Sequence, residues 1–243
     1  MFALYKKEIA AFLNTLIGYV VILVFLLITG LFLWVFPTEY NILDFAYANL
    51  DPFFMLAPFV FLFLIPAISM RMFSEEKKTG TIELLFTRPL NDLQIIGAKY
   101  LAGLSLVIIA IIPSLIYVLS VYWLGFPYGN LDLGIIWGSY IGLIFLASAF
   151  VSIGLFSSAI TDNQIIAFII GISISAFAYL GFEIIYSLDL FGNFDLFVQS
   201  LGIQAHYTSI RRGVIDLRDL IYFISLTALF LLFTHTLLSR RKW

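Results

Sequence analysis

Cysteine is absent from this sequence of 243 residues, which excludes disulfide bonds, thiolate metal sites and thiol nucleophiles. Histidine is scarce, because His206 and His235 are its only two copies. A structural zinc site would need carboxylates for most of its ligands, so we expect no metal site. Charged residues make up only 12% of the chain, and no stripe of Lys and Arg interleaved with aromatic residues indicates nucleic-acid binding.

Two further absences concern the source of energy. The chain has no G-x-x-x-x-G-K-[ST] motif, so it lacks the loop that binds ATP phosphates in P-loop proteins. It also lacks a row of acidic and basic residues within its apolar runs, which proton-driven carriers use. We therefore expect this chain to bind no cofactor and any ATP-driven work to come from a separate subunit.

What the sequence has in excess is apolar residues. They make up 62% of the chain, far above the level of soluble domains, and predict an integral membrane protein. The apolar runs show no alternation, so we predict an all-α fold with six transmembrane helices in one domain, residues 1–243. The predicted spans are 16–36, 53–73, 101–124, 135–158, 165–186 and 220–238.

The N-terminal region differs from a secretory signal, because its apolar run is too long and lacks a small-residue cleavage site. We expect a short amphipathic helix at the membrane surface before an uncleaved first span, with Phe2, Tyr5, Ile9, Phe12 and Leu13 on one side. The alternative is one continuous helix tilted into the bilayer.

The distribution of basic residues predicts the orientation. Lys and Arg gather in the N-terminal segment, in the connection after the second span and at the C-terminus, which places both termini in the cytoplasm. Arg211, Arg212 and Arg218 fall outside in this topology, in the long connection 187–219. Apolar residues spaced along that connection predict interfacial helices, punctuated by Gly202 and Gly213.

Residues 71–99 form the most polar connection of the chain. Within it, Ile82, Leu85, Phe86 and Leu93 recur at spacings near three to four, which predicts a short helix with one apolar face. Such a polar segment belongs outside the lipid. We interpret it as a docking surface for a separate soluble subunit.

The ends of this short helix carry recognisable signals. Gly80 allows a sharp entry, Thr81 can cap the helix start and Pro89 can stop the helix. Asn91 and Gln94 stand in the register of a capping box at the start of the third span.

The fourth predicted span contains Gly134, Gly138 and Gly142 on one side, including a G-x-x-x-G. This spacing is typical of close helix packing, although glycine is also frequent in membrane helices in general. Glu183 lies near the outer end of the fifth span, where we favour solvation at the interface over a role in binding substrate.

The segment SEEKKTGTIELLFTRPL resembles the cytoplasmic loop of type-2 ABC exporter permeases. In that family the loop forms a coupling helix, which contacts the nucleotide-binding subunit. The resemblance implies a cytoplasmic ABC ATPase as partner, which binds ATP and Mg, and a second membrane subunit, identical or different. It also implies a place in the bacterial inner membrane. The positions that match are Glu75, Glu76, Lys77, Gly80, Thr81, Glu83, Leu84, Leu85 and Pro89.

Two other segments, YKKEIAAFLNT near the start and RGVIDLRDLIYF before the last span, extend the resemblance over the whole chain. Together they are most similar to the permease subunit of ABC systems linked to gliding motility. The same pattern serves different cargoes, so the cargo stays open.

Two alternatives to a permease remain. The first is a noncatalytic membrane scaffold, in which the polar connection recruits a cytoplasmic partner without transport. The second is an intramembrane metalloprotease built on Glu75 and Glu76, which needs histidines at membrane depth. His206 and His235 are predicted to lie elsewhere, so the protease is disfavoured.

Overall fold

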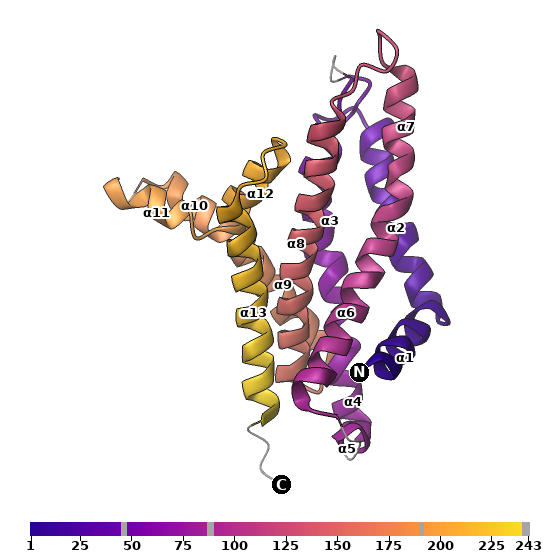
Figure 1. Ribbon diagram of the computed structural model, residues 1–243, viewed down its shortest axis with the longest axis vertical. Coiled ribbons are helices and arrows are strands. Elements are labelled where there is room, and N and C mark those ends of the chain that lie inside the picture. The colour runs from indigo at the N-terminus through magenta and orange to yellow at the C-terminus, as the bar shows by residue number, and fades with distance from the viewer. Residues whose placement is uncertain (45–47, 87–89, 190–191, 240–243) are drawn as a thin grey trace.

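The computed structural model describes residues 1–44, 48–86, 90–189 and 192–239. Helices account for nearly all regular structure in these ranges, and no strand occurs within them, which confirms the all-α prediction. The helices, labelled as in Figure 1, are α1 (Phe2–Leu13), α2 (Leu16–Trp34), α3 (Asp51–Ser69), α4 (Arg71–Lys78), α5 (Thr81–Phe86), α6 (Asp92–Ile111), η1 (Ile112–Ser114), α7 (Leu115–Leu124), α8 (Leu133–Ile160), α9 (Gln164–Ala176), η2 (Phe177–Gly181), α10 (Phe182–Ser187), η3 (Gly192–Phe194), α11 (Asp195–Gln199), α12 (Ile203–Arg211) and α13 (Leu217–Ser239).

Several of these helices join into segments of membrane length. In the described residues, five are long and apolar enough to cross a bilayer. They are Asp51–Lys78, Asp92–Leu124, Leu133–Ile160, Gln164–Ser187 and Leu217–Ser239. A sixth is reached if α1 and α2 count as one broken span. The structure therefore supports five or six membrane-spanning segments, and the predicted six is the upper of these two numbers.

The N-terminal pair is sharply bent. Phe2–Leu13 and Gly18–Trp34 meet at 63°, so the alternative of one continuous helix is wrong. The buried side of α1 carries Leu4, Glu8 and Phe12, one helical turn apart. The Glu8 carboxylate therefore lies on the side of α1 that faces the protein. Phe2, which was predicted to lie on the apolar face, is instead 67% exposed.

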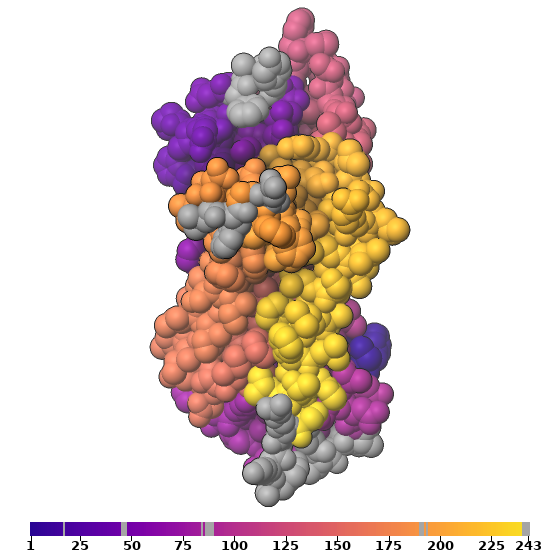
Figure 2. Space-filling view, turned by 90° about the vertical axis from the view of Figure 1, so that its left-hand side faces the viewer, coloured from indigo at the N-terminus to yellow at the C-terminus, as the bar shows by residue number. Residues whose placement is uncertain are grey.

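Helix α8 is the centre of the bundle, in contact with α3, α4, α6, α9, α12 and α13. The most apolar parts of α3 and α8 are each 72% buried, whereas the corresponding parts of α9–α10 and α13 are 22% and 17% buried. Figure 2 shows the face on which α9 (salmon) and α13 (yellow) reach the surface. The apolar faces of these peripheral helices are left for lipid or another membrane chain.

A proline in α3 leaves a backbone carbonyl free to bind α12. Pro58 has no N–H, so the carbonyl of Phe54, four residues earlier, lacks its usual helical donor. The Tyr207 hydroxyl donates to this carbonyl at 2.7 Å. Burial raises the pKa of Tyr207 well above its ordinary value, which keeps the phenol protonated as a donor.

Two of the three glycines on one side of α8 lie close to another segment of the chain. A Cβ on Gly138 would lie 3.2 Å from the Cα of Gly213, and a Cβ on Gly142 would lie 3.0 Å from Ile210 Cγ2. Both neighbours belong to α12 or the turn that follows it. A Cβ on Gly134 would meet only Asp132, which caps the same helix. The glycines therefore bring α12 close to α8.

The connection 187–219, for which interfacial helices were predicted, contains the short helices η3, α11 and α12, and α12 is not a surface helix. Its apolar residues Ile203, Tyr207 and Ile210 are buried against the bundle. Gly202 precedes α12 and Gly213 follows it at φ +84°, as the punctuation predicted. By contrast, α10 and α11 project sideways from the bundle in Figure 1.

One end of the bundle gathers segments that are far apart in the chain. Helices α1, α4 and α5 lie there, with the start of α6 and the C-terminal end of α13 (Figure 1). The predicted second span ends at residue 73, but the helix extends further into the polar connection: α4 continues from α3 after a break at Met70 and ends at Lys78. The first part of the polar connection is therefore the C-terminal continuation of a long helix, Asp51–Lys78.

Candidate functional site

The candidate site is the polar segment α4–α5 and the residues that hold it. Its first part, α4, is capped by a serine of another helix. The Ser158 hydroxyl of α8 accepts hydrogen bonds from the Phe73 and Ser74 N–H groups, at 2.8 and 3.1 Å, and donates to the Met70 carbonyl at 3.0 Å. These N–H groups lie in the first turns of α4, where donors need outside partners. Ser158 thus acts as a cap supplied by α8.

A second contact joins the other end of α4 to the same helix. The Lys77 ammonium group donates to the Ala159 carbonyl, next to Ser158 at the C-terminal end of α8. A cation is favoured at a helix C-terminus, where unpaired carbonyls concentrate negative charge. Helix α4 is therefore attached to α8 at both of its ends.

The turn between α4 and α5 depends on a glycine. Gly80 has φ +69°, a left-handed conformation that glycine adopts at low cost, and a Cβ there would meet nothing within 4 Å. The hydroxyls of Thr79 and Thr81 lie 2.9 Å apart across this turn. The sharp entry predicted at Gly80 is confirmed.

The start of the next span also agrees with the sequence. Asn91 and Gln94 form the predicted capping box, in which the Asn91 side chain accepts from a backbone N–H and Gln94 accepts from the Asn91 N–H at 3.3 Å. This cap determines where α6 begins. Further along the same helix, Lys99 lies on the side that faces the protein.

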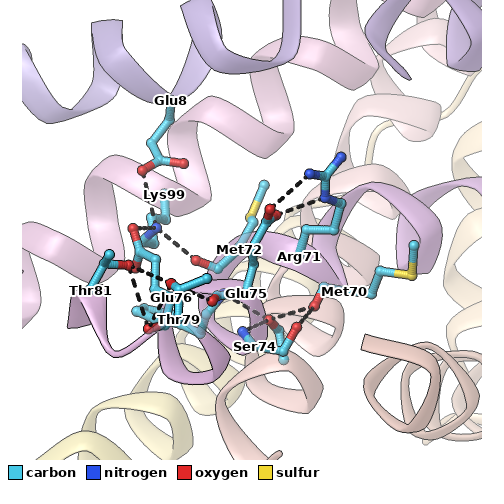
Figure 3. A network of polar contacts seen from close by, with 12 residues as sticks. Glu8, Met70, Arg71, Met72, Ser74, Glu75, Glu76, Thr79, Thr81 and Lys99 are labelled. Atoms are coloured by element: carbon cyan, nitrogen blue, oxygen red, sulfur yellow. Dashed lines mark hydrogen bonds and ion pairs between the residues drawn. The ribbon is translucent and has the colours of Figure 1, made fainter. Parts of the chain in front are cut away.

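Lys99 is the buried centre of a charged cluster, defined here as Lys99, Glu8, Glu76, Arg71 and Glu75 (Figure 3). Its Nζ lies 3.1 Å from Glu8 Oε1, 2.9 Å from Glu76 Oε1 and 2.7 Å from the Met72 carbonyl oxygen. Its side chain is 1% exposed. An ammonium group has three N–H donors, and all three find acceptors here. Lys99 thereby connects α6 with α1 and α4.

Beside Lys99, a second ion pair lies on α4 itself. Arg71 binds Glu75 in the bidentate manner, with Nε and Nη2 at 2.8 and 3.0 Å from the two carboxylate oxygens. An open cleft of about 380 Å³ lies between α1 and α4, next to both pairs. Glu76 Oε2 is buried without a hydrogen-bond partner at this cleft. The end of the bundle is thus hollowed and lined by charges of both signs.

The residues predicted to contact an ATPase differ in how exposed they are. Gly80, Thr81 and Glu83 are exposed. Glu75, Glu76 and Lys77 are partly buried, and their polar groups bind other parts of the chain. Leu85 is only 8% exposed and packs in the apolar core, so its side chain holds α5 in place. Pro89 and the Leu84 side chain lie outside the described residues.

Sequence reasoning missed the partners of Lys99. Glu8 stands 91 positions from Lys99, and no local pattern connects the two. A signal was nevertheless present, because Glu8 lies one turn from Leu4 and Phe12, and Lys99 lies one turn from Ile95 and Gly103. A charged residue at such apolar positions indicates a buried ion pair.

Glu183 accepts hydrogen bonds from Gln199 Nε2, at 3.2 and 3.4 Å, so its carboxylate joins α10 to α11.

Among the residues described, no group of three or more His, Cys, Asp and Glu side chains could hold a metal ion. The metalloprotease alternative therefore has no candidate metal site in these ranges.

These features define a polytopic helical membrane protein with a rigidly held polar segment at one end. A family model for ABC-2 family transporter proteins matches residues 37–236, and the chain belongs to this family. Its members are the permease components of ABC transporters. The predicted membership of the ABC-2 permease family is confirmed at the level of the family. No curated protein matches the chain significantly.

Proposed function

We propose that this chain is a permease subunit that couples ATP hydrolysis in a separate cytoplasmic ABC ATPase to export across the bacterial inner membrane. The observation that carries the proposal is an exposed turn, Lys78–Thr81, followed by the exposed Glu83. This turn lies at one end of an apolar helical bundle and directly follows α4, which is firmly anchored to the bundle. A partner that binds this turn would act on the bundle through α4.

The anchoring contacts indicate where a force on α4 would go. Ser158 and Lys77 tie α4 to α8, the central helix, and Lys99 ties it to α6 and α1. Packed helices move as rigid bodies against one another. A shift of α4–α5 would therefore displace α1, α6 and α8 together and change the pathway between this chain and a second membrane subunit.

The orientation completes the proposal. We place the α4–α5 end and both termini in the cytoplasm, because basic residues concentrate in those segments. The exposed apolar faces of α9 and α13 would contact lipid and the second membrane subunit. The partner ATPase would bind ATP and Mg.

The test is the charge reversal Glu83→Arg in the tagged chain expressed in its own host. Glu83 is exposed, so the variant is expected to insert normally while the ABC ATPase co-purifies at a strongly reduced level. Asp44→Arg is the matched control, because Asp44 is exposed in the connection between α2 and α3. Unchanged co-purification of the ATPase with Glu83→Arg would rule out this docking site.

Leu85→Asp is unsuited to the same test. The structure buries Leu85, so a carboxylate there would disrupt α5 rather than remove a contact with a partner. A further measurement separates permease from scaffold: a permease changes conformation when nucleotide binds to the complete complex, whereas a scaffold recruits the ATPase without such a change.

The finer part of the proposal, a link to gliding motility, is supported by the resemblance of residues 5–15 and 212–223 alone. Deletion of the gene in a gliding host, followed by tracking of single cells on a surface, tests it. Normal gliding of the deletion strain would contradict this part and leave the permease proposal standing.

A further inference from the structure

His206 is a buried histidine that the proposed function does not use. It lies on α12, away from the charged cluster, and is 9% exposed. Its Nδ1 is 2.6 Å from Asp219 Oδ1, and its Nε2 is 2.8 Å from the Ser200 carbonyl oxygen. Asp219, in the first turn of α13, is 5% exposed. The imidazole thus connects the turn after α11 with α12 and α13.

The hydrogen-bond chemistry of this arrangement requires a proton. The Ser200 carbonyl can only accept, so Nε2 must carry a hydrogen. The 2.6 Å between Nδ1 and Oδ1 then needs a second hydrogen, on either the ring or the carboxyl group. A neutral imidazole and an ionised carboxylate together lack that hydrogen. We infer that His206 and Asp219 form a proton-binding site that holds α12 and the preceding turn to α13.

The surroundings favour a charged pair. The N-terminal turn of α13 stabilises an ionised Asp219, and the ring of Tyr222 stacks on the imidazole with centroids 3.9 Å apart. Helix α8, which packs against α12, contains no Asp, Glu, Lys, Arg or His. The other titratable groups on the surrounding elements are Tyr140 on α8, Tyr179 on η2, Glu183 and Tyr186 on α10, Asp195 on α11, Tyr207 and Arg211 on α12, and Arg218, Tyr222 and His235 on α13.

The proton has a structural effect because of where the pair lies. Tyr222 donates from its hydroxyl to the Leu201 carbonyl at 2.7 Å, next to the Ser200 carbonyl that His206 binds. These two contacts hold Ser200 and Leu201, the residues that directly follow α11, and α10–α11 is the segment that projects sideways in Figure 1. Without the proton, a lone pair on Nδ1 would face a buried carboxylate. Because the closed arrangement contains the proton, it is favoured at low pH and weakened as the pH rises.

The inference is tested by hydrogen exchange of the full chain in lipid nanodiscs, measured between about pH 5.5 and about pH 8.5 and corrected for intrinsic exchange rates. We expect protection of residues 195–212 to fall about tenfold with rising pH, as loss of one charge-assisted hydrogen bond implies. In Asp219→Asn the amide group donates to Nδ1 of a neutral ring, so both hydrogen bonds persist without the extra proton. That variant should keep its protection at all pH values.

His235→Gln is the matched control, because it removes the other histidine and should keep the full pH response. It also leaves His206 as the only histidine, so imidazole nitrogen NMR signals of this variant report on that ring alone. Those signals should change over the same pH range as the protection. A flat wild-type profile, the same pH response in Asp219→Asn, or imidazole signals that do not change with pH would each overturn the inference. None of these outcomes bears on ATPase binding.

Discussion

Lys99 Nζ and Glu76 Oε1 lie 2.9 Å apart, which joins α6 to α4, the helix that presents the exposed turn. The same ammonium group binds Glu8, so a single side chain links α1, α4 and α6. A lysine that is 1% exposed is costly to bury, and it persists only because all its donors are satisfied. The contact therefore positions the proposed coupling segment.

Lys99→Met should destabilise the protein strongly, by about 3–5 kcal/mol, because it leaves the Glu8 and Glu76 carboxylates buried without their cation. Thermal unfolding in detergent measures the effect. The triple variant Lys99→Met, Glu8→Gln, Glu76→Gln should recover part of the loss. Lys78→Met, at an exposed position of α4, is the control and should change little. A Lys99→Met variant as stable as the wild type would contradict the assigned ion pairs.

Ser158→Ala should loosen α4, because it removes the acceptor of the Phe73 and Ser74 N–H groups. A lost helix cap costs about 1 kcal/mol, so exchange protection of residues 71–78 should drop about fivefold. The neighbouring Ser157 donates only within its own helix, to the Gly154 carbonyl at 2.8 Å. Ser157→Ala should therefore leave residues 71–78 unchanged, and an equal effect of both variants would argue against the cap.

Tyr207→Phe should cost about 1 kcal/mol, since the Phe54 carbonyl loses the donor that replaces the missing N–H of Pro58. The double-mutant cycle with Pro58→Ala checks the reason. The alanine introduced by Pro58→Ala would supply a backbone N–H to the Phe54 carbonyl, so the Tyr207→Phe cost should shrink in that background. An equal cost in both backgrounds would show that the proline and the tyrosine are not coupled.

Gly138→Ala should weaken the contact between α8 and α12, because the added Cβ would lie 3.2 Å from the backbone of Gly213. Backbone atoms yield less than side chains, so a loss of about 1–3 kcal/mol is expected in an unfolding titration. Gly134→Ala meets only the Asp132 side chain and should be near neutral. If the two variants behaved alike, close packing at Gly138 would not be the reason for the glycine.

Local signals in the sequence predicted local structure well. The capping box of Asn91 and Gln94, the sharp turn at Gly80 and the short helix after it involve residues within a few positions of one another. Their geometry follows from the backbone and one or two side chains. The membrane-length helices were predictable for the same reason, since each depends on a continuous apolar run.

Sequence reasoning failed where a side chain could face either a partner or the protein. Leu85 fits an apolar docking face by spacing, but the structure turns it into the core. Tyr207 and Ile210 fit an interfacial helix, yet they pack against α8 and α3. Periodicity shows which residues share a face, and it contains no information on what covers that face.

The sequence by itself determined that this protein is a set of apolar helices with one polar segment between two of them, because a backbone within lipid must satisfy its own hydrogen bonds. It also determined the family to which the chain belongs. Only the tertiary structure decided which charges are paired. Glu8 and Lys99, or Tyr207 and Phe54, meet across 91 and 153 positions of the chain, and such meetings depend on how whole helices pack.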